Sequence, residues 1–139
     1  MSKKIEHQDI QQLAKFRYEI RRFLQFSEQA AGAAGLQPQQ HQLLLQIAGA
    51  VDGTAVTISY IADAMGLRHH TVVELSKRCE AAGLVRRTHD LVDRRCVVLK
   101  LTAQGDRALR QLSEVHAQQL SEQAASLIRA LTRISKSKS

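Results

Sequence analysis

Apolar residues recur every three or four positions in two neighbouring segments near the middle of the chain. Gly66 follows the first segment, where a helix can end in a left-handed conformation, and Gly83 follows the second. Residues 57–87 are therefore predicted to form a short helix, a tight turn and a longer helix, with a strand beginning at the end. The apolar positions are Ile58, Ile61, Ala62 and Met65 in the first helix and Val72, Leu75, Cys79 and Ala82 in the second.

The second of these helices is predicted to turn a polar and basic face away from the core. A helix-turn-helix needs such a face on its second helix to enter the major groove of DNA. Together with the preceding turn, this recognition surface consists of Arg68, His69, His70, Thr71, Val73, Glu74, Lys77 and Arg78. For His69 and His70 the alternative is simple surface solvation. Glu74 either accepts from a cytosine amine or pairs with Arg78 on its own helix.

Beyond Gly83 the apolar pattern changes to a period of two. Residues 84–90 and 95–101 are each typical of a β-strand and predict an antiparallel hairpin, which after a recognition helix is a wing. Arg94 or Arg95 is expected to enter a minor groove, because that narrow, negatively polarised slot favours arginine. Asp93 is expected to brace an arginine. The charged wing residues assigned to the DNA surface are Arg86, Arg87, Asp93, Arg94 and Arg95.

Two long amphipathic helices are predicted to flank this central region, over about residues 8–31 and 102–134, with a shorter helix over 38–48. About thirty helical residues span roughly 45 Å, more than a small winged domain can cover. Part of the apolar stripe on each long helix is therefore expected to face a second subunit. The dimer-interface residues expected on this basis are Ile10, Leu13, Ile20, Leu120, Leu127, Leu131 and Ile134.

The fold class that follows is mainly α with a small antiparallel wing. It is a winged helix-turn-helix at residues 36–101 between an N-terminal dimerisation helix at 1–35 and C-terminal dimerisation helices with a short basic tail at 102–139, all in one integrated domain. The formal net charge of +7 and the pI near 9.9 favour a polyanionic partner, of which nucleic acid is the commonest. No segment reads as a leader or a membrane span, so we expect a soluble cytoplasmic protein.

Candidate chemistry beyond DNA binding is sparse. Cys79 and Cys96 lack metal-ligand spacing and predict neither a metal site nor a disulfide, and no cofactor is expected. No phosphate-binding glycine loop or nucleophile motif indicates an enzyme. Cys79 is expected to be an inert core residue. Cys96 is the candidate for redox sensing, because neighbouring Arg94 and Arg95 would lower the pKa of its thiol.

The ordered set of motifs resembles the MarR family of bacterial transcription regulators. The resemblance is carried by the helix-turn-helix, then Gly83-Leu84-Val85-Arg86, then Asp93 and Arg95 in the wing, then Leu101-Thr102 and Gly105 opening a long helix. It covers about residues 36–112 by motif and both termini by helix pattern. The sequence departs from the family where Arg68, His69 and His70 replace the usual serine cap, so operator preference does not carry over.

The resemblance implies a homodimer whose two winged domains straddle a pseudo-palindromic DNA operator. It also implies a repressor that a small aromatic effector, or oxidation of a cysteine, releases from DNA. The family would place a ligand pocket between the dimer helices and the winged domain, although the same side chains would also satisfy an ordinary core. The candidate pocket residues are Phe16, Tyr18, Ile20, His41, Leu44 and Leu45. The alternative functions are a winged-helix module for protein contacts and a cysteine redox-responsive regulator.

Overall fold

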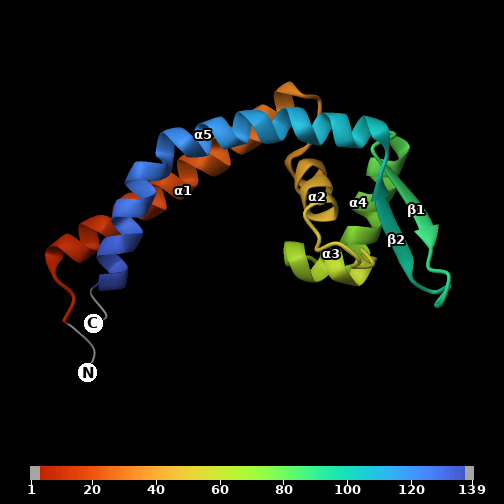
Figure 1. The fold of residues 1–139 in the computed structure, drawn as a ribbon, viewed down its shortest axis with the longest axis horizontal. Coiled ribbons are helices and arrows are strands. Elements are labelled where there is room, and N and C mark those ends of the chain that lie inside the picture. The colour runs from red at the N-terminus through yellow and green to blue at the C-terminus, as the bar shows by residue number, and fades with distance from the viewer. Residues whose placement is uncertain (1–3, 137–139) are drawn as a thin grey trace. The chain divides into compact units, whose positions relative to one another are not determined.

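The computed structural model describes residues 4–136 and contains five helices and one two-stranded sheet (Figure 1). The elements are α1 (His7–Ala33), α2 (Pro38–Ala48), α3 (Ile58–Met65), α4 (His69–Ala81), β1 (Val85–His89), β2 (Val97–Leu101) and α5 (Ala103–Lys136). The expected fold class, mainly α with an antiparallel wing, is confirmed. Helix α5 continues through Ser135 and Lys136, beyond the predicted end near residue 134, and the last three residues of the expected basic tail lie outside the described range.

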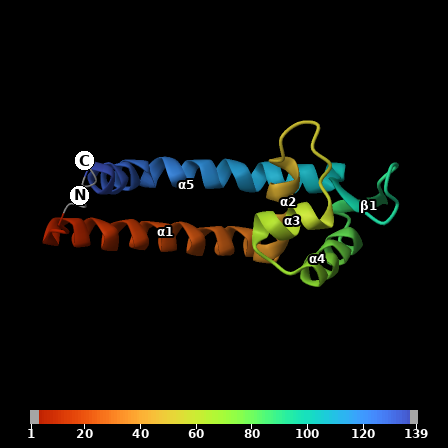
Figure 2. The ribbon, with the colours of Figure 1, turned by 90° about the horizontal axis from the view of Figure 1, so that it is seen from below.

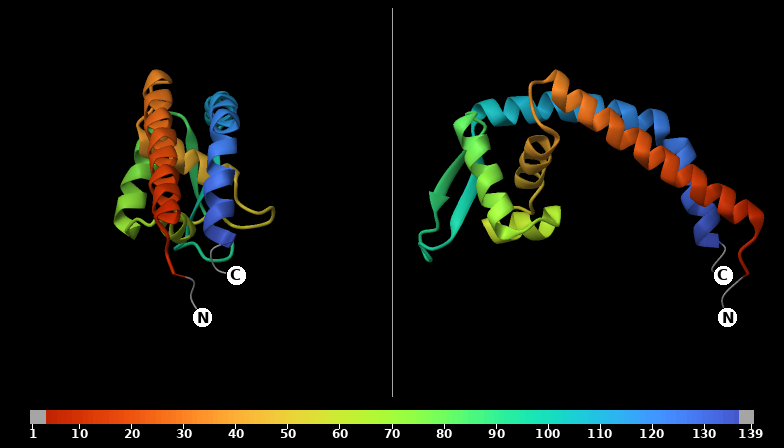
Figure 3. Two further views of the ribbon diagram at one scale, coloured as in Figure 1. Left: turned by 90° about the vertical axis from the view of Figure 1, so that its left-hand side faces the viewer. Right: turned by 180° about the vertical axis from the view of Figure 1, so that it is seen from behind.

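Two compact units make up the chain. Among the described residues, the terminal unit consists of residues 4–30 and 113–136, and the winged unit consists of residues 31–112. The core of the winged unit lies where α2, α3, α4 and the sheet meet, and Figure 3 shows the hairpin running beside α4. Its most completely buried side chains are Leu43, Leu44, Ile61, Val72, Cys79 and Leu99.

Local signals define the helix-turn-helix as the sequence indicated. The Thr57 hydroxyl caps α3 by accepting from the Tyr60 amide at 3.1 Å. Gly66 ends α3 with φ of 64°, a left-handed conformation that side chains disfavour. Ala82 departs from the expected buried face, because it is the exposed C-cap of α4 rather than part of its last turn.

The wing is a regular antiparallel ladder that runs from the pair Val85 and Leu101 to the pair His89 and Val97. Its second strand is also joined to the segment before α3, because the Leu99 amide donates to the Val56 carbonyl at 2.8 Å. The same segment forms a single antiparallel β-bridge with the wing, between Thr57 and Val98. These bonds attach the base of the wing to the helix-turn-helix.

A second junction joins the wing to α5. The Thr102 hydroxyl donates to the Gly83 carbonyl at 2.6 Å and accepts from the Gly105 amide at 3.0 Å. The Thr102 amide donates to the Leu84 carbonyl at 3.1 Å. Three segments, the end of α4, the wing and the first turn of α5, therefore meet at Thr102, which caps α5.

In the terminal unit, α1 and α5 run antiparallel (Figure 2), and hydrogen bonds between polar side chains join them. Arg133 Nε donates to Asp9 Oδ1 at 3.1 Å, and Gln123 Nε2 donates to Glu19 Oε2 at 2.7 Å. His116 Nε2 lies 2.8 Å from Ser27 Oγ. The rings of Phe23 and Phe26 meet the His116 ring edge-to-face.

This arrangement reverses one expectation about α1. The apolar periodicity of α1 predicts that Glu19 lies off the buried stripe, but Glu19 is only 2 % exposed, while Ile10, Leu13 and Leu24 are exposed. Lys15 and Arg22 pair with Glu19 at 3.3 and 3.5 Å, which offsets the cost of burying its charge. The helix pair therefore buries a polar face within the unit and leaves an apolar stripe outside it.

Candidate DNA-binding surface

The outer face of α4 is basic, as predicted, with two adjustments. Arg68, His69, His70, Lys77 and Arg78 are exposed. Val73, which was expected to face outward, is half-buried and packs against the core. The expected pair between Glu74 and Arg78 is wrong, because Glu74 Oε1 lies 3.7 Å from Lys77 Nζ instead. Both partners are more than half exposed, so this ion pair leaves the lysine free to exchange it for a phosphate.

The start of α4 has no side-chain cap. Arg68 occupies the N-cap position in an extended conformation and makes no capping bond from its side chain. Thr71, in the first turn of α4, is half-buried, and its amide donates to the Arg68 carbonyl at 3.1 Å. A helix start without a cap is less stable than one with serine at that position. Arg68, His69 and His70 therefore place polar groups on the surface at a cost in helix stability.

A small hollow of about 100 Å³ brings the recognition helix and the wing together. His69 and Val73 of α4 line it on one side, and Arg95 and Cys96 of the wing line it on the other. Ser59, in the first turn of α3, also lines the hollow and was not identified from the sequence. Its position beside the wing follows only from the fold, because nothing in the sequence of α3 distinguished Ser59 from its neighbours.

The wing arginines differ in how firmly they are held. Asp93 Oδ1 accepts from the backbone amide of Arg95 at 3.1 Å and from its Nε at 3.2 Å. These bonds hold the pKa of Asp93 below its ordinary value. The predicted bracing role of Asp93 is thus observed, and the braced residue is Arg95. The Arg95 side chain is still 92 % exposed, so the brace orients it without covering it.

Arg86 and Arg87 alternate across β1 as expected. Arg86 is exposed, whereas Arg87 is half-buried. The Arg87 amide donates to Glu80 Oε2 at 3.1 Å, and its buried Nε has no hydrogen-bond partner among residues 4–136. Arg86 is therefore the strand arginine that is open to a ligand.

Two aliphatic residues at the wing tip were not identified from the sequence. Leu91 and Val92 are 96 % and 94 % exposed. The only signal in the sequence was an apolar pair between two aspartates, where a turn is normally polar.

The cysteines do not have the electrostatic setting of a redox switch. Partial burial, and then the charge of Asp93, raise the pKa of the Cys96 thiol, which lies 3.6 Å from Asp93 Oδ2. The expectation that neighbouring arginines would lower this pKa is wrong, because the effect of Arg95 is smaller than that of burial and the carboxylates. Burial raises the pKa of Cys79 to about 11. Both thiols are therefore protonated near neutral pH, which disfavours attack on an oxidant.

The expected dimer residues are distributed over the outer faces of the terminal unit. Ile10, Leu13, Ile20, Leu120 and Leu131 are exposed, and Leu127 and Ile134 are half-buried. Leu24 and Ile128 extend the exposed set, which we call the apolar stripe. Single exposed aliphatic residues are ordinary on a protein surface, but a row along two paired helices is typical of an interface.

The expected ligand-pocket residues do not share one environment. Phe16 and Ile20 line a hollow of about 420 Å³ on α1, together with Arg17, Arg21 and Leu24. Tyr18 is exposed, with the cations of Lys15, Arg21 and Arg22 near its ring. Leu44 is fully buried in the core of the winged unit, His41 is buried and Leu45 is exposed. Leu44 thus has the ordinary core role that was the alternative for these residues.

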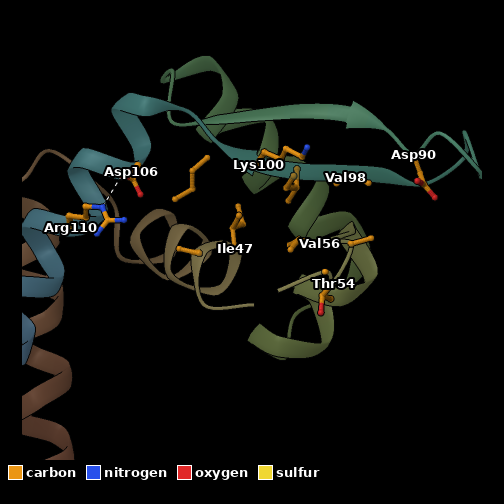
Figure 4. Close-up of a pocket in the computed structure, with 13 residues that line it drawn as sticks. Ile47, Thr54, Val56, Asp90, Val98, Lys100, Asp106 and Arg110 are labelled. Atoms are coloured by element: carbon orange, nitrogen blue, oxygen red, sulfur yellow. Dashed lines mark hydrogen bonds and ion pairs between the residues drawn. The ribbon is translucent and has the colours of Figure 1, made fainter. Parts of the chain in front are cut away.

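A larger groove of about 640 Å³ lies on the winged unit between α2, residues 53–56, β2 and the first turns of α5 (Figure 4). Its charged groups are of both signs. Arg110 Nε donates to Asp106 Oδ2 at 2.9 Å, which raises the pKa of Arg110, and Lys100 and Asp90 also line the groove. Because these charges largely cancel, the groove lacks the single sign that would attract a phosphate backbone.

Within residues 4–136, no three His, Cys, Asp or Glu side chains gather closely enough to hold a metal ion. The described helices, including the long α1 and α5, contain no stretch apolar enough to span a bilayer.

Comparisons with known proteins agree with this fold. The model of the MarR family matches residues 34–95. CouR from Rhodococcus jostii RHA1, bound to p-coumaroyl-CoA, is 25% identical with a TM-score of 0.61, and the match covers 72% of this chain and 68% of CouR. AbsC, a MarR family transcriptional regulator from Streptomyces coelicolor, is 20% identical with a TM-score of 0.71 and 97% coverage of both chains.

A variant of S. aureus MepR bound to an oligodeoxyribonucleotide is 22% identical with a TM-score of 0.64. That match covers 88% of this chain and 94% of MepR. No curated protein matches the chain by sequence.

Proposed function

We propose that the chain, whose residues 34–95 match the model of the MarR family of transcription regulators, binds a specific double-stranded operator as a homodimer and represses transcription until an organic anion releases it. Its general role is that of a DNA-binding regulator, and members of this family are not enzymes. Specificity, repression, dimerisation and release are the parts that belong to the proposal.

The observation that carries specific DNA binding is the continuity between α4 and the wing. His69 and Arg95 line one hollow, so the recognition helix and the wing present their polar groups on one connected surface. The exposed Arg68, His70, Lys77 and Arg78 extend it along α4, and Arg86 and Arg94 extend it along the wing. A helix in the major groove and a braced arginine in the adjacent minor groove would together position the protein and read bases.

The first experiment identifies the operator. The purified protein is mixed with sheared genomic DNA, retained fragments are sequenced, and enriched fragments are titrated in mobility-shift assays. We expect a pseudo-palindromic sequence to be enriched and its affinity to fall steeply with salt, on the order of tens-fold over a fourfold change. If no sequence is enriched over bulk DNA, specific regulation is contradicted and a protein-contact module becomes the better description.

The second experiment tests the wing on that operator. Arg95→Ala should weaken binding by about 1–3 kcal/mol and should leave the thermal unfolding temperature unchanged, because the Arg95 side chain is almost fully exposed. Arg129→Ala is the matched control, since Arg129 is an exposed arginine on the terminal unit. Equal affinity for Arg95→Ala and wild type would contradict the wing's role.

The effector part of the proposal rests on the α1 hollow. Phe16, Ile20 and Leu24 supply apolar contacts there, and Arg17 and Arg21 supply positive charge. This combination suits an aromatic or acyl carboxylate, or an aromatic acyl thioester whose carrier bears phosphate groups. CouR, the 25% identical relative, was solved with such a molecule, p-coumaroyl-CoA.

Release is measured by titrating p-coumaroyl-CoA and simple aromatic carboxylates into the protein–operator complex. At least one should dissociate the complex, and Arg21→Ala should raise the concentration needed by about tenfold, the loss expected for one charged hydrogen bond. Arg129→Ala again serves as the control. A normal response from Arg21→Ala would rule out the α1 hollow as the site, and no response to any compound would leave a constitutive regulator.

A further inference from the structure

The wing tip carries the two most exposed large apolar side chains that the structure describes. Leu91 and Val92 are 96 % and 94 % exposed, compared with 77 % for Val51, the next most exposed. Water in contact with two adjacent aliphatic side chains is unfavourable, and turns normally avoid them. Their exposure therefore needs a reason beyond the fold of the hairpin.

The tip is held in a defined shape while these side chains project. The Asp90 amide donates to the Cys96 carbonyl at 2.9 Å, and the Cys96 amide donates to the Asp93 carbonyl at 3.0 Å. His89 Nδ1 lies 2.8 Å from the Arg94 carbonyl oxygen. These bonds close the turn on both sides of Leu91 and Val92, so the pair is presented outward by hydrogen-bonded backbone.

Two exposed arginines lie close to Leu91 and Val92 in the sequence of the wing tip. Arg94 and Arg95 follow within three residues and are exposed, and His89, Asp90, Leu91 and Arg94 line one shallow hollow. Of the two nearby carboxylates, Asp93 is already engaged by Arg95. An apolar tip beside exposed arginines matches the chemistry of a minor groove, where arginine meets the negative walls and an aliphatic side chain can press between bases.

We propose that Leu91 and Val92 form an apolar wedge that enters the minor groove beside Arg94 and Arg95 and partly unstacks one base step. This inference rests on the proposed DNA-binding function and adds how the wing would deform its site. The energy released by covering two aliphatic side chains offsets the cost of unstacking, so the contact favours flexible pyrimidine–purine steps. The wedge would thus select DNA by deformability at positions where no hydrogen bond reads a base.

The test compares the wild type with the double variant Leu91→Ser/Val92→Ser. The probe is the duplex that the wild type selects from a random-sequence pool, with 2-aminopurine placed in turn at each step of the segment that the wing protects. We expect wild-type binding to raise 2-aminopurine fluorescence at one step and to bend the duplex, as measured by energy transfer between its ends. The double variant should lose both signals and bind at least about tenfold more weakly.

The salt dependence separates this contact from the arginine contacts. The double variant should keep the wild-type slope of log affinity against log salt, because no phosphate contact is removed, whereas Arg95→Ala should lower the slope by about one. Val51→Ser is the matched control, since Val51 is an exposed valine in the loop before α3. It should leave affinity and fluorescence unchanged.

The possible results distinguish a failure of the wedge proposal from a failure of the proposed DNA-binding function. If the wild type selects no sequence, the proposed function fails and the wedge fails with it. If the wild type selects a duplex but the double variant binds and bends it equally, the wedge alone is overturned. It is also overturned if affinity falls while the wild type itself produces no fluorescence change at any step, or if the double variant changes only self-association or binding to another protein.

Discussion

At the scale of single residues, Gly105 leaves no room for a side chain. A Cβ at this position would overlap the backbone carbonyl of Leu84, which cannot move without disturbing the wing. We expect Gly105→Ala to lower the free energy of unfolding by about 1–3 kcal/mol through overpacking. Gly32→Ala is the control, because Gly32 is helical with nothing within 4 Å of its Cβ position, and it should raise stability by up to about 1 kcal/mol. Urea titrations of both variants would check this, and equal effects would contradict it.

A second residue-scale expectation concerns Cys96. Burial and Asp93 raise the pKa of its thiol, so native Cys96 should react with iodoacetamide more slowly at pH 8 than a free thiol does. Asp93→Asn removes the nearest carboxylate and should accelerate the reaction. Cys79 should stay unmodified until the protein unfolds, because it is fully buried and its pKa is about 11. Mass spectrometry of the modified sites gives the rates, and slower modification in Asp93→Asn would refute the electrostatic explanation.

Sequence reasoning succeeded at residues whose roles are local. Thr57, Gly66 and Thr102 cap helices through bonds within three or four positions, so their residue types were sufficient signals. It failed at Glu19 and Cys96, whose environments depend on distant or folded partners. Gln123 meets Glu19 across two helices, and Asp93 outweighs Arg95 at Cys96 because of geometry within the wing tip.

At the scale of elements, α4 begins without a side-chain cap, and a substitution at its N-cap position can supply one. Arg68→Ser would supply the missing N-cap and should stabilise the protein by about 1 kcal/mol, the usual value of such a cap. Arg68→Ala is the matched control, since it removes the same guanidinium without adding a cap. The difference between their free energies of unfolding isolates the cap. Equal free energies of unfolding for the two variants would mean that the backbone amides in the first turn of α4 already have other hydrogen-bond partners.

The bounds of elements were predictable where the pattern and the end signals coincided. The helix over Pro38–Ala48 has the predicted limits, because Pro38 is suited to the first helical turn and Gly49 follows the last residue. The strands are shorter than predicted at their outer ends, since residues near the tip form a turn stabilised by Asp90 and Asp93. The alternation of apolar and polar residues does not show at which residue the hydrogen bonds between the two strands end.

At the scale of the whole molecule, the apolar stripe is the surface through which the proposed homodimer would form. Leu120→Glu/Leu131→Glu would place two charges where the proposed partner packs, and burying unpaired charge is strongly unfavourable. We expect sedimentation equilibrium to show at least a tenfold weaker dimer. Ser121→Glu/Thr132→Glu, at exposed neighbouring positions, controls for added charge. A double variant that dimerises as tightly as the wild type would exclude these leucines from the interface.

The terminal unit should also depend on pH through Glu19. Hydrogen bonding by Gln123, together with Lys15 and Arg22, holds the pKa of Glu19 below its ordinary value of 4.5. A lowered folded-state pKa contributes stability above the ordinary value and loses it as pH falls through the folded value. The unfolding temperature should therefore fall below about pH 4.5 less steeply in Glu19→Gln than in wild type or in the exposed control Glu28→Gln. Parallel curves would contradict this.

The sequence predicted that each long helix has more apolar surface than contacts within one chain can cover. It could not decide which face each helix turns to the other, because an amphipathic pattern does not say whether a stripe meets the same chain or another. Asp9, Glu19 and Ser27 settle that question within the terminal unit through contacts to α5. Polar residues between helices specify register more strictly than interchangeable apolar ones.

The junction at Thr102 has a consequence for protein engineering. Its hydroxyl and amide bond to Gly83, Leu84 and Gly105, so α4, the wing and the start of α5 share one set of contacts. A chimera that exchanges operator preference with a relative should therefore transplant residues 68–105 as a block. Exchanging α4 or the wing alone would leave mismatched surfaces at this junction, whereas the tip between Asp90 and Cys96 can be altered separately.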